Sequence, residues 1–174
     1  GIITDTQVFF SANTTNAAME AAAELVKHGA KLQEIIRANY VNKSTNFLRI
    51  WGIALERLFI DSSFGGIATV VTQKDIADIG ATPEEIESIA GVVSEFLNAV
   101  LDESHDIIVV YRETEDGAVK GSARARTKNV AEIAEKLYGG GGHKFAAGFK
   151  VPNAKMEKTQ DGTWRVARNT TVAK

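Results

Sequence analysis

Four consecutive glycines, Gly139 to Gly142, followed directly by His143, constrain the structure of this chain more than any other feature. A glycine in a regular element costs about 0.5–1 kcal/mol relative to alanine, so a run of four needs a reason. One reason is that a backbone without Cβ atoms can bring its N–H groups close around an anion such as phosphate. The other is a tight turn between a helix and a strand, with a histidine at the surface. The residues alone leave both interpretations open.

The stretch before the glycines is expected to add a cation to the same place. Residues 118–126 alternate with a period of two, which predicts a strand with Lys120, Ser122, Arg124 and Arg126 on one face. Asn129 is expected to begin a helix that ends before the glycines. An arginine can bind phosphate through two parallel hydrogen bonds, and a histidine can donate to a phosphate oxygen. The candidate phosphate-binding residues are Ser122, Arg124, Gly140, Gly141, Gly142 and His143.

Hydrophobic periodicity places helices and strands in alternation along the rest of the chain, which indicates an α/β fold. The expected helices span 16–28, 32–39, 45–60 and 83–100, the last beginning at a Thr82–Glu85 capping box. The expected strands span 1–4, 67–72, 107–111 and 149–151. The segment 62–66 is expected to separate two domains, and 153–174 is interpreted as a polar basic tail.

Composition excludes several classes of protein. The chain has 174 residues, of which 44% are hydrophobic and 24% charged, as in ordinary globular domains. It has no cysteine, which excludes disulfides, cysteine nucleophiles and thiolate metal sites. No apolar run approaches the ~18 residues needed to cross a bilayer. We therefore expect a cytoplasmic protein with no membrane partner.

Charge is unevenly distributed along the sequence. Residues 75–116 carry a net charge of −11, and residues 120–150 carry +5. A basic local field favours phosphate ligands. The alternative is two solvated faces of opposite sign, and charge alone does not decide between them.

Asp5 is the second candidate site residue. It follows the expected strand 1–4, and α/β sheets bind ligands at the carboxyl ends of their strands. A carboxylate there could bind a hard cation such as Mn²⁺ or Mg²⁺, although one carboxylate cannot form a metal site and an aspartate often only caps its own loop. The sequence contains neither a nucleophilic triad nor a phosphate loop with Lys-Ser/Thr after the glycines.

Two stretches resemble the DHH phosphoesterase family. The first is GGGGHKFAAG at 139–148, preceded by SARAR at 122–126 and a helix, which is similar to the C-terminal domain of that family. The second is GIITDTQVFF at 1–10, followed by Asn13-Thr14-Thr15 and an alanine-rich helix, which resembles the family's fourth conserved motif. The resemblance covers about residues 1–151 and is strongest to the NrnA-like oligoribonucleases and 3′-phosphoadenosine 5′-phosphate phosphatases.

The resemblance implies a fold and an activity. It implies that 1–60 are the C-terminal remnant of a parallel-sheet DHH catalytic domain with a linker helix, and that 61–152 form a mixed-sheet, DHH-associated substrate-binding domain. A manganese pair, with Asp5 as its last ligand, would activate water for phosphoester hydrolysis. Arg124, the glycines and His143 would bind the phosphate and nucleotide of a short RNA or of 3′-phosphoadenosine 5′-phosphate.

The chain departs from the family pattern in ways that limit this expectation. The Asp-His-His triplet and the earlier aspartate motifs are absent, so the main catalytic residues are unknown and this chain alone is expected to be inactive. Gln7 stands where a glycine is common, and Ala125 stands where a serine often follows the arginine. The expected partners are the nucleotide substrate, a missing N-terminal catalytic half and a second copy of the chain.

Three alternatives stay open at this point. Cyclic-dinucleotide phosphodiesterases share a similar ending, and RecJ-like single-strand exonucleases share the core. The third is not an enzyme: alanyl-tRNA synthetases contain a similar domain whose glycine-rich loop helps to bind RNA. In that case the basic strand would follow a nucleic-acid backbone with strongly salt-dependent affinity.

Overall fold

The computed structural model describes residues 1–6, 8–9, 14–40, 44–88, 90–91, 101 and 104–168. The chain forms two compact units, Gly1–Ser44 and Thr45–Lys174, and each is described here by itself. No helix in the described ranges is long and apolar enough to cross a membrane.

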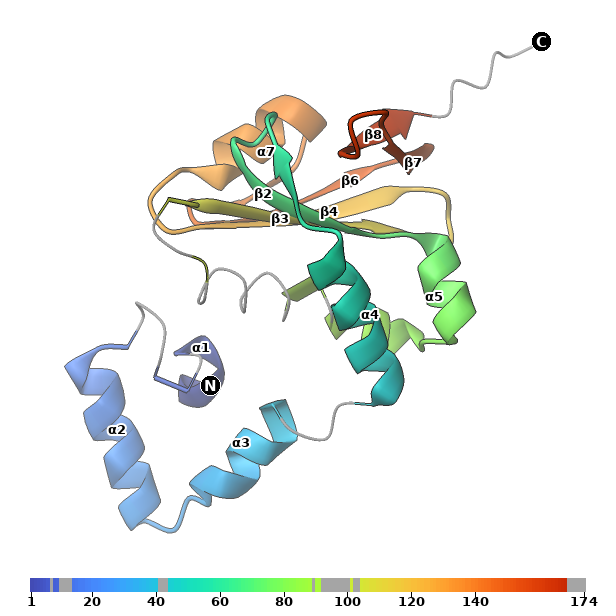
Figure 1. Ribbon diagram of the computed structural model, residues 1–174. Helices are drawn as coiled ribbons and strands as arrows, with labels where there is room; N and C mark the ends of the chain where they lie inside the picture. Colours follow the sequence, from blue (N-terminus) through green and yellow to red (C-terminus); the bar gives the residue numbers. More distant parts are fainter. Residues whose placement is uncertain are drawn as a thin grey trace. The chain divides into compact units, whose positions relative to one another are not determined.

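Helices are the only regular elements among the described residues of the first unit. Its helices are α1 (Ile2–Asp5), α2 (Asn16–Lys27) and α3 (Leu32–Tyr40) (Figure 1). The side chain of Thr15 accepts a hydrogen bond from the backbone N–H of Ala18 at 3.1 Å and so caps α2. The two longer helices confirm the periodicity of the sequence. Between them lies an apolar hollow of about 700 Å³ whose rim includes the exposed side chains of Met19, Leu25, Val26 and Ile35.

The strand predicted for residues 1–4 is wrong. Those residues belong to α1, where the N–H groups of Thr4 and Asp5 both bond to the carbonyl of Gly1 at 3.0 Å. The two isoleucines suggested a strand, but a strand needs a neighbour to satisfy its backbone groups, and the described part of this unit contains no other strand. A helical turn satisfies the same groups locally. Asp5 is therefore an exposed residue of a short helix and does not follow a strand.

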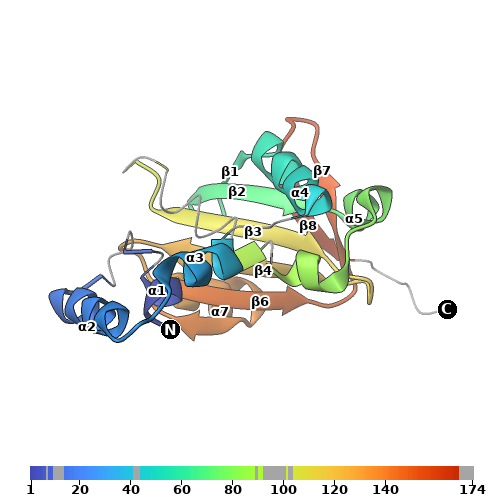
Figure 2. The same cartoon turned by 90° about the horizontal axis from the view of Figure 1, so that it is seen from below.

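The second unit is built on a six-stranded mixed sheet in the order β1-β2-β3-β4-β6-β5 (Figures 1 and 2). Strands β2 and β3 pair in parallel, and the other neighbours pair antiparallel. This confirms the mixed α/β class expected for this part of the chain. The strands are β1 (Phe59–Asp61), β2 (Gly66–Val71), β3 (Ile107–Glu113), β4 (Val119–Ala125), β5 (Gly141–His143) and β6 (Ala146–Val151).

Helices cover the two faces of this sheet differently. Helix α7 (Val130–Tyr138) packs on one face against β4, β5 and β6 (Figure 1). Helices α4 (Thr45–Glu56) and α5 (Gln73–Ile79) lie on the other face (Figure 2). Strand β3 is buried on both faces, which explains its continuous apolar run, whereas β4 alternates between buried and half-buried residues. We call the two sides the α7 face and the α4 face.

The segment 62–66 is a turn rather than a boundary between compact units. Helix α4 ends at Glu56, before the predicted limit at 60, and β1 then pairs with β2 through that turn. The buried carboxylate of Asp61 fixes it by accepting from the backbone N–H of Ser63 at 2.9 Å and from the hydroxyl of Tyr111 at 2.5 Å. The compact units divide at Ser44 instead. Assignment of residues 1–60 to a catalytic domain stays a prediction.

The segment after Pro152 is part of the core and not a tail up to Arg168. Strands β7 (Ala154–Lys158) and β8 (Trp164–Arg168) form an antiparallel hairpin. Ala154 and Met156 are 2% and 6% exposed and pack in the same core cluster as Val119 and Phe149. This hairpin was not recognised from the sequence, because every second residue of β7 is charged and faces outward.

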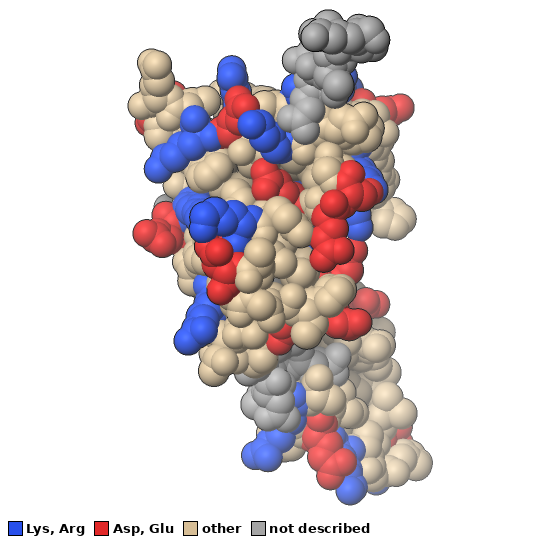
Figure 3. Space-filling view, turned by 90° about the vertical axis from the view of Figure 1, so that its right-hand side faces the viewer, with Lys and Arg blue, Asp and Glu red and all other residues tan. Residues whose placement is uncertain are grey.

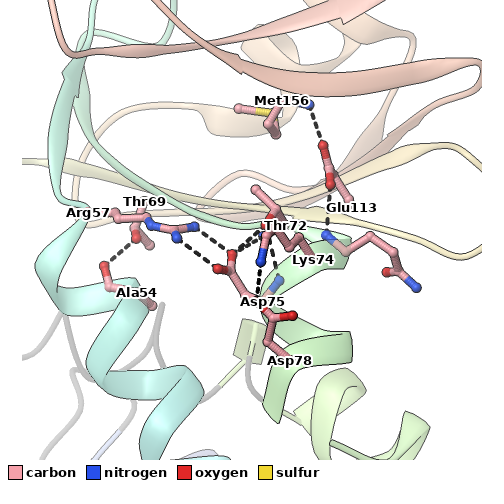
Figure 4. Close-up of polar contacts among 10 residues, drawn as sticks. Ala54, Arg57, Thr69, Thr72, Lys74, Asp75, Asp78, Glu113 and Met156 are labelled. Atoms are coloured by element: carbon pink, nitrogen blue, oxygen red, sulfur yellow. Dashed lines mark hydrogen bonds and ion pairs between the residues drawn. The ribbon is translucent and has the colours of Figure 1, made fainter. Parts of the chain in front are cut away.

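An ion pair joins helix α5 to the residue that follows α4 (Figure 4). Arg57 donates to both carboxylate oxygens of Asp75, at 2.5 and 2.7 Å, and Asp75 also accepts from the backbone N–H of Thr72 at 2.8 Å. Burial opposes ionisation of Asp75, but these hydrogen bonds outweigh it and hold its pKa below the ordinary value. Glu113 joins the same region to β7 by accepting from the N–H groups of Gln73 and Met156 (Figure 4).

The charge segregation of the sequence does not persist in space. Acidic residues of 75–116 pair with basic residues of 120–150, as in Lys120–Glu87 at 2.8 Å and Lys150–Asp116 at 2.5 Å. Figure 3 accordingly shows acidic and basic side chains next to one another on the face that it presents. The Thr82–Glu85 capping box is confirmed, with Thr82 N–H donating to the Glu85 carboxylate at 2.9 Å. Most of the helix predicted to follow it, residues 92–100, lies outside the described residues.

Candidate phosphate-binding face

Strand register brings the predicted phosphate-binding residues together in rows across β4, β6 and β5. Arg124 is in register with Ala146, which is in register with His143. Two residues before Arg124 on β4, Ser122 is in register with Gly148, which is in register with Gly141. Side chains in register point to the same side of a sheet, so both rows lie on the α4 face. We call the first the arginine row and the second the small-residue row.

The arginine row places a cation and a histidine on either side of a small residue. Neighbouring strands lie ~4.8 Å apart, so the Cα atoms of Arg124 and His143 are separated by roughly 10 Å. Arg124 donates to the carbonyl of Ala123 at 3.1 Å and forms no ion pair with a described carboxylate. The His143 side chain is exposed. The guanidinium therefore has donors available for an anion on this face.

The small-residue row forms a flat surface beside it. Neither Gly141 nor Gly148 has a side chain, and Ser122 contributes only a hydroxyl. Among the described residues, a Cβ added at Gly141 would meet nothing within 4 Å, and one added at Gly148 would meet the carbonyl oxygen of Gly121 at 3.6 Å. Packing against the described residues therefore does not require glycine at either position. Absence of side chains there leaves room for a ligand to approach the sheet.

The first two glycines of the run do not form a phosphate nest, because their amides are used within the fold. The N–H of Gly139 bonds to the carbonyl of Glu135 at 2.8 Å, and the N–H of Gly140 bonds to the carbonyl of Ala134 at 3.1 Å. Gly139 ends α7 in the left-handed conformation, with φ of 66°. The remaining two, Gly141 and Gly142, pair with β6 in the edge strand β5.

Two of the glycines are explained by close backbone contacts instead. A Cβ on Gly140 would lie 2.5 Å from the carbonyl oxygen of Gly148, and one on Gly142 would lie 2.4 Å from that of Ala146. Gly142 is in register with Ala147, which is buried on the α7 face. Of the six predicted residues, Ser122, Arg124, Gly141 and His143 thus share the α4 face, and Gly140 and Gly142 have structural roles.

A third row on the same face was missed as a site from the sequence. Lys120 is in register with Lys150, two residues beyond the small-residue row. Both lysines line a pocket of about 280 Å³ together with Ser122 and Gly148. The period of two in 118–126 already placed Lys120 beside Ser122, and extending the same alternation to β6 would have identified Lys150.

Asp106 fixes the chain just after Arg124. Its carboxylate accepts from the backbone N–H groups of Arg126, Thr127 and Lys128 at 3.1, 2.8 and 2.9 Å. Partial burial opposes ionisation, but these donors outweigh it and lower the pKa of Asp106. The carboxylate therefore stays charged at neutral pH and holds the turn between β4 and α7, which positions Arg124 at the end of its strand.

The described residues do not fit a metal centre. No group of three or more His, Asp or Glu side chains in the described ranges is placed to hold a metal ion. Asp5 belongs to the first compact unit, and the arginine row belongs to the second. We therefore derive no step through a metal. The α4 face has the chemistry of an anion-binding surface, with a guanidinium, an imidazole, two ammonium groups and a hydroxyl around a surface without side chains.

Sequence comparison with protein families matches residues 67–166 to the DHHA1 domain. The match covers more than half of the chain, including β2, the arginine row and the β7–β8 hairpin. This chain belongs to the DHHA1 domain family. Its membership places Arg124 and the GGGGHKFAAG segment inside the matched region, as the resemblance noted in the sequence led us to expect.

Two curated relatives agree with this assignment. The chain is 33% identical over 170 residues to the bifunctional oligoribonuclease and PAP phosphatase NrnA of Thermus thermophilus, covering 97% of this chain and 48% of that protein. It is 26% identical over 152 residues to the protein of the same name from Bacillus subtilis, covering 87% and 45%. The chain thus spans about half the length of these relatives.

A solved structure supports the fold. An exopolyphosphatase-related protein from Bacteroides fragilis superposes with a TM-score of 0.72 at 21% identity, covering 86% of this chain and 42% of that one. This likeness concerns the fold alone. It shows that the mixed sheet and its helices also occur in a protein of low sequence similarity.

Proposed function

We propose that this DHHA1-family chain binds the phosphate and terminal nucleotide of short oligoribonucleotides or of 3′-phosphoadenosine 5′-phosphate, as part of a phosphoesterase. The observation that carries the proposal is the arginine row, in which Arg124 and His143 lie on either side of Ala146 beside a row without large side chains. The family assignment and the activities for which the two relatives are named support the substrate class.

In this proposal the α4 face holds substrate and does not cleave it. Arg124 would bind a terminal phosphate through its guanidinium, and His143 would donate to the same group from the edge strand. The small-residue row would let the ribose and base lie close to the sheet. Charge-assisted contacts of this kind orient a phosphoester and offset the charge that develops during hydrolysis.

Hydrolysis itself is proposed for the parent enzyme, in which Asp5 would be one ligand of a bound Mn²⁺ or Mg²⁺ and the metal would supply an activated water. The described residues do not supply the rest of such a centre. We therefore expect the chain alone to bind nucleotide and to show no metal-dependent turnover. Purified chain incubated with Mn²⁺ and a 5′-phosphorylated diribonucleotide tests this, with an Asp5→Ala variant to identify contaminating activity.

Amide chemical-shift mapping tests the binding proposal directly. Titration with the 5′-phosphorylated diribonucleotide pApA, without metal, is expected to shift the amide signals of Arg124, Gly141, His143 and Gly148. Signals from α7, on the opposite face, should move much less. Shifts confined to the β7–β8 hairpin, or none at millimolar ligand, would contradict the proposal. If long RNA of any sequence shifts the same amide signals as strongly as pApA does, without preference for a terminal phosphate, the result would instead favour an RNA-binding module.

A further inference from the structure

Four charged side chains separate two neighbouring pockets of the second unit. Glu87, Arg112, Lys120 and Lys150 line the pocket of about 280 Å³ that contains Ser122 and Gly148. The same four line a second pocket of about 320 Å³, which extends to Thr114 and Asp116. They therefore form the divide between the two pockets.

Arg112 is the member of this group with a buried hydrogen-bond donor that no described residue accepts from. It is only 9% exposed, and its Nη2 donates to the Glu87 carboxylate at 2.6 Å. Its Nε is buried and has no hydrogen-bond partner among the residues that the structure describes. A buried guanidinium is normally fully hydrogen-bonded, because unpaired donors carry the full cost of their desolvation. The arrangement leaves Arg112 with unused capacity for an anion.

The partner of Arg112 is an exposed carboxylate. The Glu87 side chain is 61% exposed and contacts Lys120 at 2.8 Å as well as Arg112. The hydrogen bond from Lys120, opposed by partial burial and supported by the charge of Arg112, lowers the pKa of Glu87, so it is ionised at neutral pH. The Lys120–Glu87 pair is exposed on both sides and contributes little to stability, because water competes for both partners. Glu87 is therefore an anion that another anion can replace.

Register places these cations in line with one another and parallel to the arginine row. Arg112 is in register with Lys120, and Lys120 with Lys150, so all three lie on the α4 face. Lys120 and Arg124 are four residues apart on β4, which separates the two rows by about 13 Å at a rise of ~3.3 Å per residue. The small-residue row lies between them. One phosphate group cannot contact both rows, but two phosphates of one nucleotide chain can.

We propose that Arg112, Lys120 and Lys150 form a second phosphate site, which the Glu87 carboxylate occupies when no ligand is bound. This inference rests on the proposed function, because the first phosphate is held at Arg124. A ligand with two phosphates would displace Glu87 and also compete with Asp116 for Lys150. The chain would then prefer an oligonucleotide with at least two phosphates to a nucleoside monophosphate.

The test compares AMP with pApA by calorimetric titration over a range of salt concentrations. Lys150→Ala is expected to weaken pApA binding by about three- to tenfold, the range for losing one hydrogen bond of ordinary strength at an exposed lysine, and to leave AMP within twofold. The slope of log K against log salt for pApA should fall by about 0.7, the value for one phosphate contact of a single strand. Glu87→Gln should strengthen pApA binding by a similar factor.

Matched variants separate this effect from net charge and folding. Lys136→Ala removes a lysine from α7, and Glu84→Gln removes a carboxylate three residues before Glu87; neither should change the preference for pApA over AMP. Thermal melts confirm that each variant is folded. If Lys150→Ala and Glu87→Gln change AMP and pApA affinity equally, or not at all, the second site is wrong.

The Arg124→Ala variant distinguishes failure of this inference from failure of the proposed function. If Arg124→Ala binds neither AMP nor pApA while Lys150→Ala keeps the preference for pApA, the proposed function stands and only the second site is wrong. Unchanged binding in Arg124→Ala contradicts the proposed function and with it the two-phosphate arrangement.

Discussion

Arg124 of β4 and His143 of β5 are in register with the same residue, Ala146 of β6, from opposite sides. A helix separates the two residues in sequence, and the return of β6 between their strands places both on the α4 face. The glycine-histidine motif therefore contributes to a site through sheet register. Its first two glycines end a helix, and its last two build the edge strand that carries His143.

Gly121→Ala is predicted to destabilise the fold. A Cβ at this position would lie 1.9 Å from the ring of Phe149, which also stacks on Tyr138 at a centroid distance of 4.5 Å. Because the ring is held by its neighbours, overpacking should cost about 1–3 kcal/mol. Urea unfolding monitored by circular dichroism measures the loss. An unchanged midpoint would show that the ring moves freely and that the packing described here is wrong.

Gly148→Ala is predicted to affect binding and not stability. Its added Cβ would make only an ordinary contact at 3.6 Å, so the unfolding midpoint should change little. The same methyl group would stand on the small-residue row beside Ser122, where a ligand is proposed to lie. Affinity for pApA should fall at least threefold in calorimetry. Normal affinity in a folded Gly148→Ala variant would show that the ligand does not approach this row.

The Arg57–Asp75 pair predicts part of the acid sensitivity of the fold. The folded-state pKa of Asp75 is lowered, so its contribution to stability is present above the ordinary value of 3.8 and is lost as pH falls through the folded-state value. Asp75→Asn should cost about 1–3 kcal/mol at pH 7, because Arg57 loses its charged partner. Below pH ~4 the difference from wild type should shrink.

Thermal melts from pH 7 to pH 3 check this prediction. Asp78→Asn is the control, because its exposed pair with Lys74 on the same helix should have no measurable effect on stability at either pH. A difference between Asp75→Asn and wild type that stays constant down to pH 3 would argue against a lowered pKa.

Met156→Ala is predicted to destabilise the second unit, although it lies in the segment expected from the sequence to be a tail. Met156 is 6% exposed and packs in the core cluster, so truncation should cost about 2–5 kcal/mol. Its neighbour Lys155 is exposed, and Lys155→Ala should change stability little. Equal, small effects of both substitutions in urea unfolding would mean that β7 does not pack on the sheet.

Much of the fold was predictable because local and tertiary preferences agree. The alternation in β4, the apolar run of β3 and the Asn129 cap of α7 all match the structure. Failures occurred where tertiary contacts decide. Ile2 and Ile3 suggested a strand but have no described strand to pair with, and Phe59 continued a helical pattern until pairing with Ala68 placed it in β1.

The site was predictable in part for the same reason. A period of two correctly placed Ser122 and Arg124 on one face, and Gly141 and His143 of the motif are in register with that face, while their role in binding stays a prediction. Sequence could not show that the amides of Gly139 and Gly140 end α7, because that depends on where the helix stops. Nor could it show that Arg112 lies beside Lys120, since the two are joined only through the register of β3 and β4.

The most direct test of the central claim is calorimetric titration of the chain with pApA at low salt and without metal. Wild type is expected to bind, and Arg124→Ala to lose at least tenfold in affinity, the scale for a charge-assisted phosphate contact. Arg165→Ala, which removes an exposed guanidinium from β8, should bind like wild type. If Arg124→Ala binds as tightly as wild type and Arg165→Ala, the arginine row is not a phosphate-binding site.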